Sequence, residues 1–593
     1  MCGFIGKFSY DIIDVNSLET CNSYIECRGP DSKVVHSSSS ELLKYCFIFN
    51  RLSILDLAEN ANQPMVDEFS GNILMFNGEI FNHEELRKYL IKKGMNFKTS
   101  HSDTEVIIKG LIAEDIKFVQ KLKGQFAIFY FDKNKNKAYL IRDRLGQKPL
   151  YFSTLNNSLV FGSNLKSLVK LNNSKDLDIK SLDEYLRYGV VSSPNTIFKN
   201  YYKVEPSQII EVDFNNRTLE IRDSIYWDVE DSLDEKPFIN EEFFEILNNS
   251  VKIRTQADVD IASILSGGLD STAITKFISK SNNIDTFSVI SDDKKYDESK
   301  WSYKVANKYK TQHKTISINS KISKEDIRES LDSLDEPYSD PSVIPSFKLY
   351  REISKHYKVA ISGDGGDELL GGYKRTFMTL NNNPIPSGLL KTIYNIYPSF
   401  LGTGSYFLSK VKNKEESYQS TLSDDKFVKL LFSESIESKK NIFLGREKNL
   451  YKALLISDYK FFLPEQMLFK VDRTSMANSL EVRSPFLDHE LIEYIMSHTA
   501  NYLNLKRSKP ILKDFLMNDF DKKFVERPKQ GFVFDLESWI FDNLNFINDT
   551  FEDGSVVGNY FKNPTKKLSI YKSRVNALRI WKIYTLENYL LNF

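Results

Sequence analysis

Residues 260–272 read Asp-Ile-Ala-Ser-Ile-Leu-Ser-Gly-Gly-Leu-Asp-Ser-Thr, an apolar run that leads into a glycine-rich turn. The run predicts a buried strand, and Ile274 and Phe277 continue at helical spacing, so a helix should follow the turn. Glycines between a strand and a helix allow successive backbone N–H groups to face an anion, and the helix N-terminus adds positive potential. The stretch therefore predicts a phosphate-binding loop. It is not a Walker loop, because the Gly-Lys-Ser/Thr ending is missing.

A second glycine-rich loop, Ser362-Gly363-Asp364-Gly365-Gly366-Asp367-Glu368, follows the strand-like run Lys358 to Ile361. Three carboxylates on one loop repel each other unless a cation or a role as a base accounts for them. A solvated acidic turn is the alternative interpretation. Another strand-like run lies at Thr286 to Ile290, and helical segments separate the runs. This alternation predicts an α/β domain with a parallel sheet covered by helices.

The first two hundred residues favour an α+β fold instead. Gly124 to Asp132 and Lys137 to Asp143 are β-branched and aromatic runs around a polar loop, which predicts an antiparallel hairpin. Ile73 to Phe76 is an apolar run that ends at Asn77-Gly78, a turn signal. Helical stretches intervene at 82–93 and 104–113.

The chain becomes polar and acidic between about Val212 and Asn240, which marks a domain boundary. We therefore predict a first domain over 2–212, a linker over 213–240 and a second domain over 241–593.

The bulk composition excludes several classes of protein. Lysine plus arginine and aspartate plus glutamate number 80 each, so the net charge is zero and no nucleic-acid partner is expected. Four cysteines in 593 residues, none in a CxxC pair, predict neither a disulfide framework nor a zinc site. Without a signal-peptide pattern or a run of 18 apolar residues, we expect a cytoplasmic protein with no membrane partner.

Cys2 is the most informative cysteine. Removal of Met1 would leave a free α-amine on the residue that carries the thiol, and an α-amine with a pKa of about 8 can take the proton of the nucleophile. Such a nucleophile needs an oxyanion hole, and Asn77-Gly78 offers a side-chain amide and a backbone N–H. A simple hairpin turn is the alternative interpretation of Asn77-Gly78.

A substrate amino acid also needs charged partners at its two ends. Arg51 could hold its carboxylate, and Glu79 and Asp103 could hold its ammonium group. Taken singly, Arg51 and Asp103 could equally be surface charges.

Over about residues 2 to 168 the chain resembles the class II, N-terminal-cysteine glutamine amidotransferases. The resemblance implies an αββα N-terminal-nucleophile fold in which Cys2 attacks the side-chain amide of glutamine and Asn77 and Gly78 hold the oxyanion. The matching blocks are Cys2-Gly3-Phe4-Ile5-Gly6, Arg28-Gly29-Pro30-Asp31, Arg51-Leu52-Ser53-Ile54, Asn77-Gly78-Glu79-Ile80-Phe81-Asn82, Ser102-Asp103-Thr104-Glu105 and Arg142-Asp143-Arg144-Leu145-Gly146.

From about residue 245 to 535 the chain resembles the synthetase domain of the asparagine synthetases, which carry a pyrophosphatase-type ATP loop. Besides the two glycine-rich loops, the matching blocks are Asp335-Glu336-Pro337, Asp340-Pro341-Ser342, Asp472 to Ala477, Glu481 to Asp488, Lys509 and Arg527 to Phe532. The resemblance implies an ATP site, Mg²⁺ ligands and a cation for the departing pyrophosphate. The residues implied for ATP are Leu265, Ser266, Gly267, Gly268, Asp270, Ser271, Val289, Ser362 and Gly363; those for Mg²⁺ are Asp270 and Asp367; and Lys529 is the cation.

Together the two resemblances imply an ATP-dependent ligase that takes nitrogen from L-glutamine and passes ammonia through a tunnel, with Arg28 as a gate, to L-aspartate. A homodimer is also implied. The chain departs from the family at Asp364, where the family has a glutamate that acts as the base, and at Asn164, where the family has a glutamate near the domain interface. Asp364 leaves open a relative that amidates another small carboxylate, such as a sugar acid. A non-catalytic relative or a lone glutaminase is disfavoured, because both sets of motifs are intact.

Overall fold

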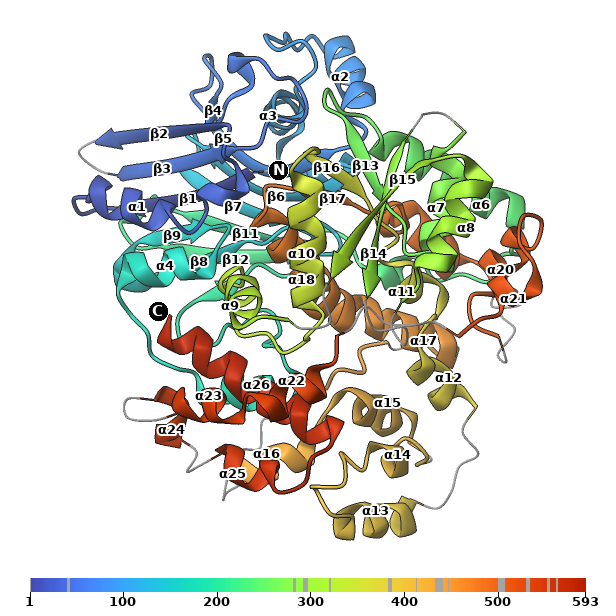
Figure 1. The fold of residues 1–593 in the computed structure, drawn as a ribbon. Helices are drawn as coiled ribbons and strands as arrows, with labels where there is room; N and C mark the ends of the chain where they lie inside the picture. Colours follow the sequence, from blue (N-terminus) through green and yellow to red (C-terminus); the bar gives the residue numbers. More distant parts are fainter. Residues whose placement is uncertain are drawn as a thin grey trace.

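The computed structural model describes residues 2–39, 43–280, 284–291, 297–318, 322–381, 387–411, 413–431, 441–445, 447–499, 507–528, 534–551, 555–560 and 564–592. Figure 1 shows a strand-rich N-terminal unit beside a unit built on a third sheet, with further helices along the bottom of the view. In these described parts of the chain, no helix combines the length and the apolar character needed to cross a bilayer.

The N-terminal unit consists of two sheets, each of six strands. The strand pairs in both sheets are antiparallel, as in β1 with β3 and β5 with β6. In spatial order, the first sheet contains β10 (Tyr202–Lys203), β8 (Tyr151–Ser153), β9 (Leu159–Gly162), β1 (Cys2–Ser9), β3 (Lys44–Arg51) and β2 (Ser32–Ser39). The second contains β12 (Glu220–Ile225), β11 (Gln208–Asp213), β7 (Lys137–Arg142), β6 (Gly124–Asp132), β5 (Ile73–Ile80) and β4 (Met65–Val66).

Alternating side chains on the strands create separate cores. Phe4 and Phe8 of β1 join Phe129 of β6 in the core between the sheets, whereas Ile5 faces the other way and joins Leu18 of α1. The outer faces are covered by α1 (Val15–Asn22) and α4 (Leu165–Asn172) on the first sheet, and by α2 (His83–Lys92) and α3 (Asp103–Glu114) on the second. The predicted αββα arrangement is therefore confirmed.

The predicted turn at Asn77-Gly78 is wrong. Strand β5 runs on to Ile80, and Gly78 pairs with Phe126 of β6 inside the sheet. Glycine is needed there because a Cβ on residue 78 would lie 2.0 Å from the carbonyl oxygen of Gln125. The dipeptide marks a close approach of two strands rather than a reversal of the chain.

The segment 213–240, which the sequence assigns to a linker, contains a strand. β12 pairs antiparallel with β11 from Gln208↔Ile225 to Asp213↔Glu220. The second sheet of the N-terminal unit thus continues to Ile225 before α6 (Asn240–Arg254) begins the next unit.

The second unit contains the predicted parallel sheet. Its order is β15 (Gln312–Ile318), β14 (Asp285–Ser291), β13 (Ile261–Ile264), β16 (Val359–Ile361) and β17 (Glu481–Arg483), and every pair is parallel. One face packs on α10 (Val343–Ser354) and α18 (Phe469–Met476), and the other face is covered by elements including α7 (Leu269–Ile278) and α8 (Ser299–Tyr309).

The last helix returns to the N-terminal unit. In α26 (Arg574–Leu591), Trp581 is fully buried in a core that it shares with Tyr185 of α5 (Ile179–Tyr188). The hydroxyl of Tyr185 also donates to the carbonyl oxygen of Lys582 at 2.9 Å. The two units therefore share a hydrophobic core.

Candidate active sites and the cavity between them

Cys2 begins the central strand of the first sheet and is 6% exposed. Its backbone N–H donates to Oδ1 of Asn77 at 3.1 Å, so the atom that becomes the α-amine after removal of Met1 is already anchored. Burial raises the pKa of the Cys2 thiol, while Arg51 acts in the opposite direction. The thiol is therefore protonated near neutral pH and needs a base beside it.

Asn77 presents a free donor beside this thiol. The residue is fully buried, and its Nδ2 has no hydrogen-bond partner among the described residues. A buried, unpaired amide N–H is costly unless a ligand completes it. Nδ2 of Asn77 is therefore suited to receive a developing oxyanion, as the sequence predicts.

Of the predicted glutamine-binding residues, Arg51, Glu79 and Asp103 line one small cavity with Cys2 and Gly78, whereas Asn77 is not among the residues that line it. The guanidinium of Arg51 is fixed by its own loop, since it donates to the carbonyl oxygens of Ala58 at 3.0 Å and Leu55 at 3.3 Å. Asp103 accepts from the backbone N–H of Ile80 at 3.1 Å. Burial raises the pKa of both Glu79 and Asp103. The arrangement has a cation at one side and acids at the other, which suits an amino acid.

Two residues of the second unit reach into this site, and sequence reasoning assigned no role to either. Arg483 of β17 donates to Glu79 at 3.1 Å and to Glu481 at 2.5 Å, and all three are buried. Burial acts to raise the pKa of Glu481, but Arg483 and Lys148 are among the groups that outweigh it, and the pKa is lowered to about 2. The block Glu481 to Asp488 contained these residues, but only the fold places them against β5.

The phosphate loop lies where the sheet order reverses. From β13 the chain continues to β14 and β15 on one side, whereas β16 and β17 lie on the other. Ligands of open α/β sheets bind at such a switch point, outside the carboxyl ends of the strands. The turn Ser266-Gly267-Gly268 leads directly into α7, and a Cβ on Gly363 would lie 2.9 Å from the backbone N of Ser271. The two predicted loops therefore touch.

The remaining predicted ATP residues surround this point. Leu265 is fully buried, and its N–H donates to the carbonyl oxygen of Phe287 on β14 at 2.8 Å. Val289 lies further along β14 and packs in the same cluster as Ile264. Ser271 donates to the carbonyl oxygen of Gly268 at 3.2 Å, which closes the first turn of α7.

Asp270 and Asp367, the predicted Mg²⁺ ligands, share one cation in the structure. Nζ of Lys509 lies 2.5 Å from Oδ2 of Asp270 and 2.5 Å from Oδ1 of Asp367. No group of three or more histidines, cysteines or acids suited to a metal occurs within the described ranges. Two carboxylates that jointly hold a cation nevertheless fit Mg²⁺, which takes one or two carboxylates together with substrate phosphates.

Asp364 lies in the loop that follows β16. Its carboxylate accepts from Oγ of Ser362 at 2.8 Å, and its carbonyl oxygen accepts from Oγ of Ser484. These contacts hold the residue at the edge of an internal cavity.

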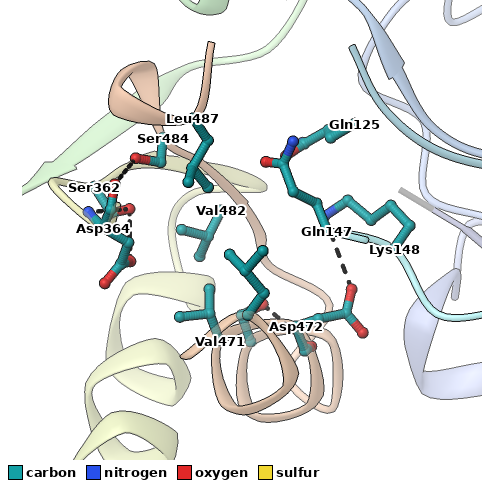
Figure 2. Close-up of a pocket in the computed structure, with 12 residues that line it drawn as sticks. Gln125, Gln147, Lys148, Ser362, Asp364, Val471, Asp472, Val482, Ser484 and Leu487 are labelled. Atoms are coloured by element: carbon teal, nitrogen blue, oxygen red, sulfur yellow. Dashed lines mark hydrogen bonds and ion pairs between the residues drawn. The ribbon is translucent and has the colours of Figure 1, made fainter. Parts of the chain in front are cut away.

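This cavity lies between the two units. Figure 2 shows Gln125, Gln147 and Lys148 of the first unit on one side and Ser362, Asp364 and Ser484 of the second on the other. Leu468, Val471, Val482 and Leu487 supply apolar walls, and the space is about 20 Å³. Gln125, which pairs with Glu79 across β5 and β6, and Asp364 both line this cavity.

Arg28 forms a buried ion pair with Asp472, one of the residues that line this cavity. Nη1 and Nη2 donate to Asp472 of α18 at 2.8 and 3.0 Å. Lys148 lies 3.8 Å from the same carboxylate, and all three side chains are buried. Burial acts to raise the pKa of Asp472, but Arg28 and Lys148 outweigh it and lower the pKa to about 2.

The sequence also singles out Lys529 and Asn164. Lys529 lies outside the described residues. Asn164 caps α4, with Oδ1 accepting from the N–H of Ser167 at 3.2 Å, and the interface contact is made by the next residue, where the N–H of Leu165 donates to Asp335 at 3.0 Å. Although residue 164 is not the family's glutamate, a polar contact between the units remains, from Leu165 to Asp335.

In a comparison with known proteins, two family models match the chain, one in each unit. The glutamine amidotransferase domain model matches residues 1–227, and the asparagine synthase model matches residues 242–587. The glutamine-hydrolyzing asparagine synthetase 1 of Bacillus subtilis (strain 168) is 29% identical over 92% of this chain and 89% of its own length. A putative asparagine synthetase 2 of Methanocaldococcus jannaschii is 31% identical over 80% of this chain and 98% of its own length. "Amidase chry2" of Gibberella zeae is 27% identical over 81% of this chain and 78% of its own length.

The cysteine-bearing αββα unit and the ATP-loop unit together define a glutamine-dependent ligase. The chain belongs to the asparagine synthase family. The predicted family and fold class are confirmed.

Proposed function

We propose that the chain converts L-aspartate, L-glutamine, ATP and water into L-asparagine, L-glutamate, AMP and diphosphate. The observation that best supports this coupled reaction is the cavity between the units, which is lined both by Gln125, beside the cysteine site, and by Asp364, in the second glycine-rich loop. Two half-reactions that share ammonia need such a passage, because free ammonium is not a nucleophile and an acyl-adenylate is destroyed by water.

In the first half-reaction, the α-amine of processed Cys2 takes the thiol proton, and the sulfur attacks the side-chain amide carbon of glutamine. Nδ2 of Asn77 and the N–H of Gly78 stabilise the oxyanion, and ammonia leaves. Water then releases glutamate from the thioester. Arg51, Glu79 and Asp103 bind the amino-acid end, with Arg483 balancing the charge of Glu79.

In the second half-reaction, an acceptor carboxylate oxygen attacks the α-phosphorus of ATP and diphosphate leaves. Leu265, Val289, Ser362 and Gly363 hold the AMP portion, and Ser266 to Gly268 with Ser271 face the phosphates at the start of α7. Asp270 and Asp367 are the residues that would hold Mg²⁺, which supplies charge neutralisation at the phosphates when bound. Lys529 is assigned to the departing diphosphate.

Ammonia then attacks the carbonyl carbon of the acyl-adenylate, and AMP leaves. We assign Asp364 as the group that accepts the proton released from the attacking nitrogen, because it borders the cavity. The contacts with Ser362 and Ser484 hold Asp364 in place for this role.

A second candidate is amidation of another small carboxylate. Asp364 supports it, because its side chain is one methylene shorter than the family's glutamate and leaves more room beside the acceptor. The similarity to Amidase chry2 is compatible with a wider range of activities in this family.

The deciding experiment incubates the Met1-processed protein with glutamine, ATP and Mg²⁺, with aspartate or without an acceptor, and measures diphosphate and asparagine. Aspartate-dependent diphosphate matched by asparagine supports the proposal. Glutamate release without aspartate-dependent diphosphate rejects aspartate as the acceptor and directs the search to sugar acids.

A further inference from the structure

Lys509 occupies an unusual position between the two loops. Its ammonium lies 2.6 and 2.5 Å from the carboxylate oxygens of Asp270 and 2.5 Å from Asp367, and the residue is 4% exposed. The residue precedes Pro510 and has φ of 48°, a left-handed conformation that is uncommon for lysine. The start of α20 (Pro510–Leu516) thus delivers a single cation to two acids that come from different loops.

Glycines make the space for this cation. A Cβ on Gly372 would lie 1.9 Å from Oδ1 of Asp367 and 2.4 Å from Cε of Lys509. A Cβ on Gly366 would lie 2.6 Å from Oδ1 of Asp270. Both glycines therefore make room for the three-membered bridge of Asp270, Lys509 and Asp367.

The bridge joins one ammonium to two carboxylates that come from different parts of the chain. Removal of one partner from a buried ionic group is costly, because the remaining charges lose their compensation. A divalent ion that approached the two carboxylates would have to displace the ammonium from both.

We propose that Lys509 is an internal counter-cation that keeps divalent metal out of the site formed by Asp270 and Asp367 until the triphosphate of ATP arrives. This inference rests on the assignment of those two acids as metal ligands under the proposed function. The triphosphate supplies oxygen ligands for the metal and alternative anionic partners for the ammonium, so metal and nucleotide enter together.

The test measures Mn²⁺ retained by the full-length protein in ultrafiltration, with and without an ATP analogue that has a methylene group between the α- and β-phosphorus. We expect the wild type to retain Mn²⁺ about tenfold more tightly when the analogue is present. We expect Lys509→Met to bind Mn²⁺ about tenfold more tightly than the wild type when nucleotide is absent, and Mn²⁺ to raise the melting temperature of this variant but not that of the wild type. Equal Mn²⁺ affinity of the wild type with and without the analogue would overturn the proposal, as would a Lys509→Met variant that binds no better than wild type.

Two variants separate the possible failures. Lys513→Met lies on the same helix and removes a 2.8 Å ion pair to Glu526 outside the site, so it should bind Mn²⁺ as the wild type does. Asp367→Asn should lose the analogue-dependent Mn²⁺; if it retains all of it, the metal assignment itself fails. If Lys509→Met does not fold by circular dichroism, Lys509→Gln replaces it, and Mn²⁺ binding by that variant that is no tighter than wild type in the absence of nucleotide would overturn the proposal.

Discussion

The guanidinium of Arg28 donates to both carboxylate oxygens of Asp472, at 2.8 and 3.0 Å, while its Nε donates to the carbonyl oxygen of Cys2 at 3.2 Å. One side chain thus ties the nucleophile's strand to α18 of the other unit. Asp472 and Asp364 line the same cavity. A change in the Arg28–Asp472 pair should therefore affect the reactions at both Cys2 and Asp364.

Replacing Asp472 by asparagine should uncouple the two half-reactions. Arg28 and Lys148 would lose their shared anion, and a broken buried ion pair costs about 3–5 kcal/mol. We expect a lower melting temperature and more glutamate released per asparagine formed. Asp31→Asn, which removes the more exposed 2.7 Å pair to Lys358 between the same units, should leave the ratio at one. An unchanged ratio in Asp472→Asn would argue against a role of the pair in coupling.

The same pair predicts sensitivity to acid. The folded-state pKa of Asp472 is about 2, below the 3.8 of a free aspartate, so its stabilising contribution is present above pH about 4 and disappears as the pH falls toward 2. Acid unfolding followed by tryptophan fluorescence should therefore show a steeper loss of stability over that window in the wild type than in Asp472→Asn. Identical slopes would show that this carboxylate does not contribute.

Cys2→Ala should separate the two nitrogen sources. The variant lacks the sulfur that attacks glutamine, but it keeps the phosphate loop and Asp364, which lie in the other unit. We expect no glutamate release and wild-type amide formation from added ammonium chloride. Glutamine hydrolysis by Cys2→Ala would refute the assigned nucleophile.

Asn77→Ala removes the unpaired donor beside the thiol. Loss of one oxyanion-hole donor typically lowers kcat by about 10²–10³, and we expect this loss for glutamine hydrolysis with little change in KM. Asn72→Ala is the matched control, because this buried asparagine donates to Tyr130 at 2.6 Å away from the site and should affect stability rather than kcat. A similar kcat for both variants would remove Nδ2 of Asn77 from the mechanism.

Asp364→Asn should block only the last step. Asparagine has nearly the same shape as aspartate but cannot take a proton from ammonia. Exchange of labelled diphosphate into ATP should therefore continue in the presence of the acceptor, whereas amide formation stops. Amide formation at the wild-type rate would show that Asp364 is not the base, and loss of the exchange would place Asp364 in adenylate formation.

Local patterns in the sequence were sufficient for the fold class and for both loops. The apolar run before Ser266 became β13, and the run before Ser362 became β16, because buried parallel strands are short and continuously apolar. The hairpin β6–β7 follows its predicted bounds within one residue. Asn77-Gly78 misled the turn prediction because the close contact with Gln125 that requires the glycine is made by a strand 47 residues away, counted from Gly78 to Gln125.

The residues to which sequence reasoning assigned no role of their own are those that act across long separations. Arg483 contacts Glu79 from 404 residues away, and Lys509 contacts Asp270 from 239 residues away. Nothing in the local sequence around either cation indicates its partner, because a buried ion pair between units depends on how the units dock. A basic residue in a block that otherwise lacks an assigned role is the one signal that could have pointed to them.

We propose that nitrogen passes from glutamine at Cys2 to the acceptor near Asp364 without entering bulk water. The most direct measurement supplies glutamine labelled with ¹⁵N in its side-chain amide, together with an excess of unlabelled ammonium, ATP, Mg²⁺ and aspartate, and determines the ¹⁵N content of the asparagine formed. Direct transfer between the two sites predicts asparagine in which the amide is mostly ¹⁵N despite the unlabelled pool. Asparagine with the isotope ratio of the bulk ammonium would show instead that the nitrogen passes through bulk water.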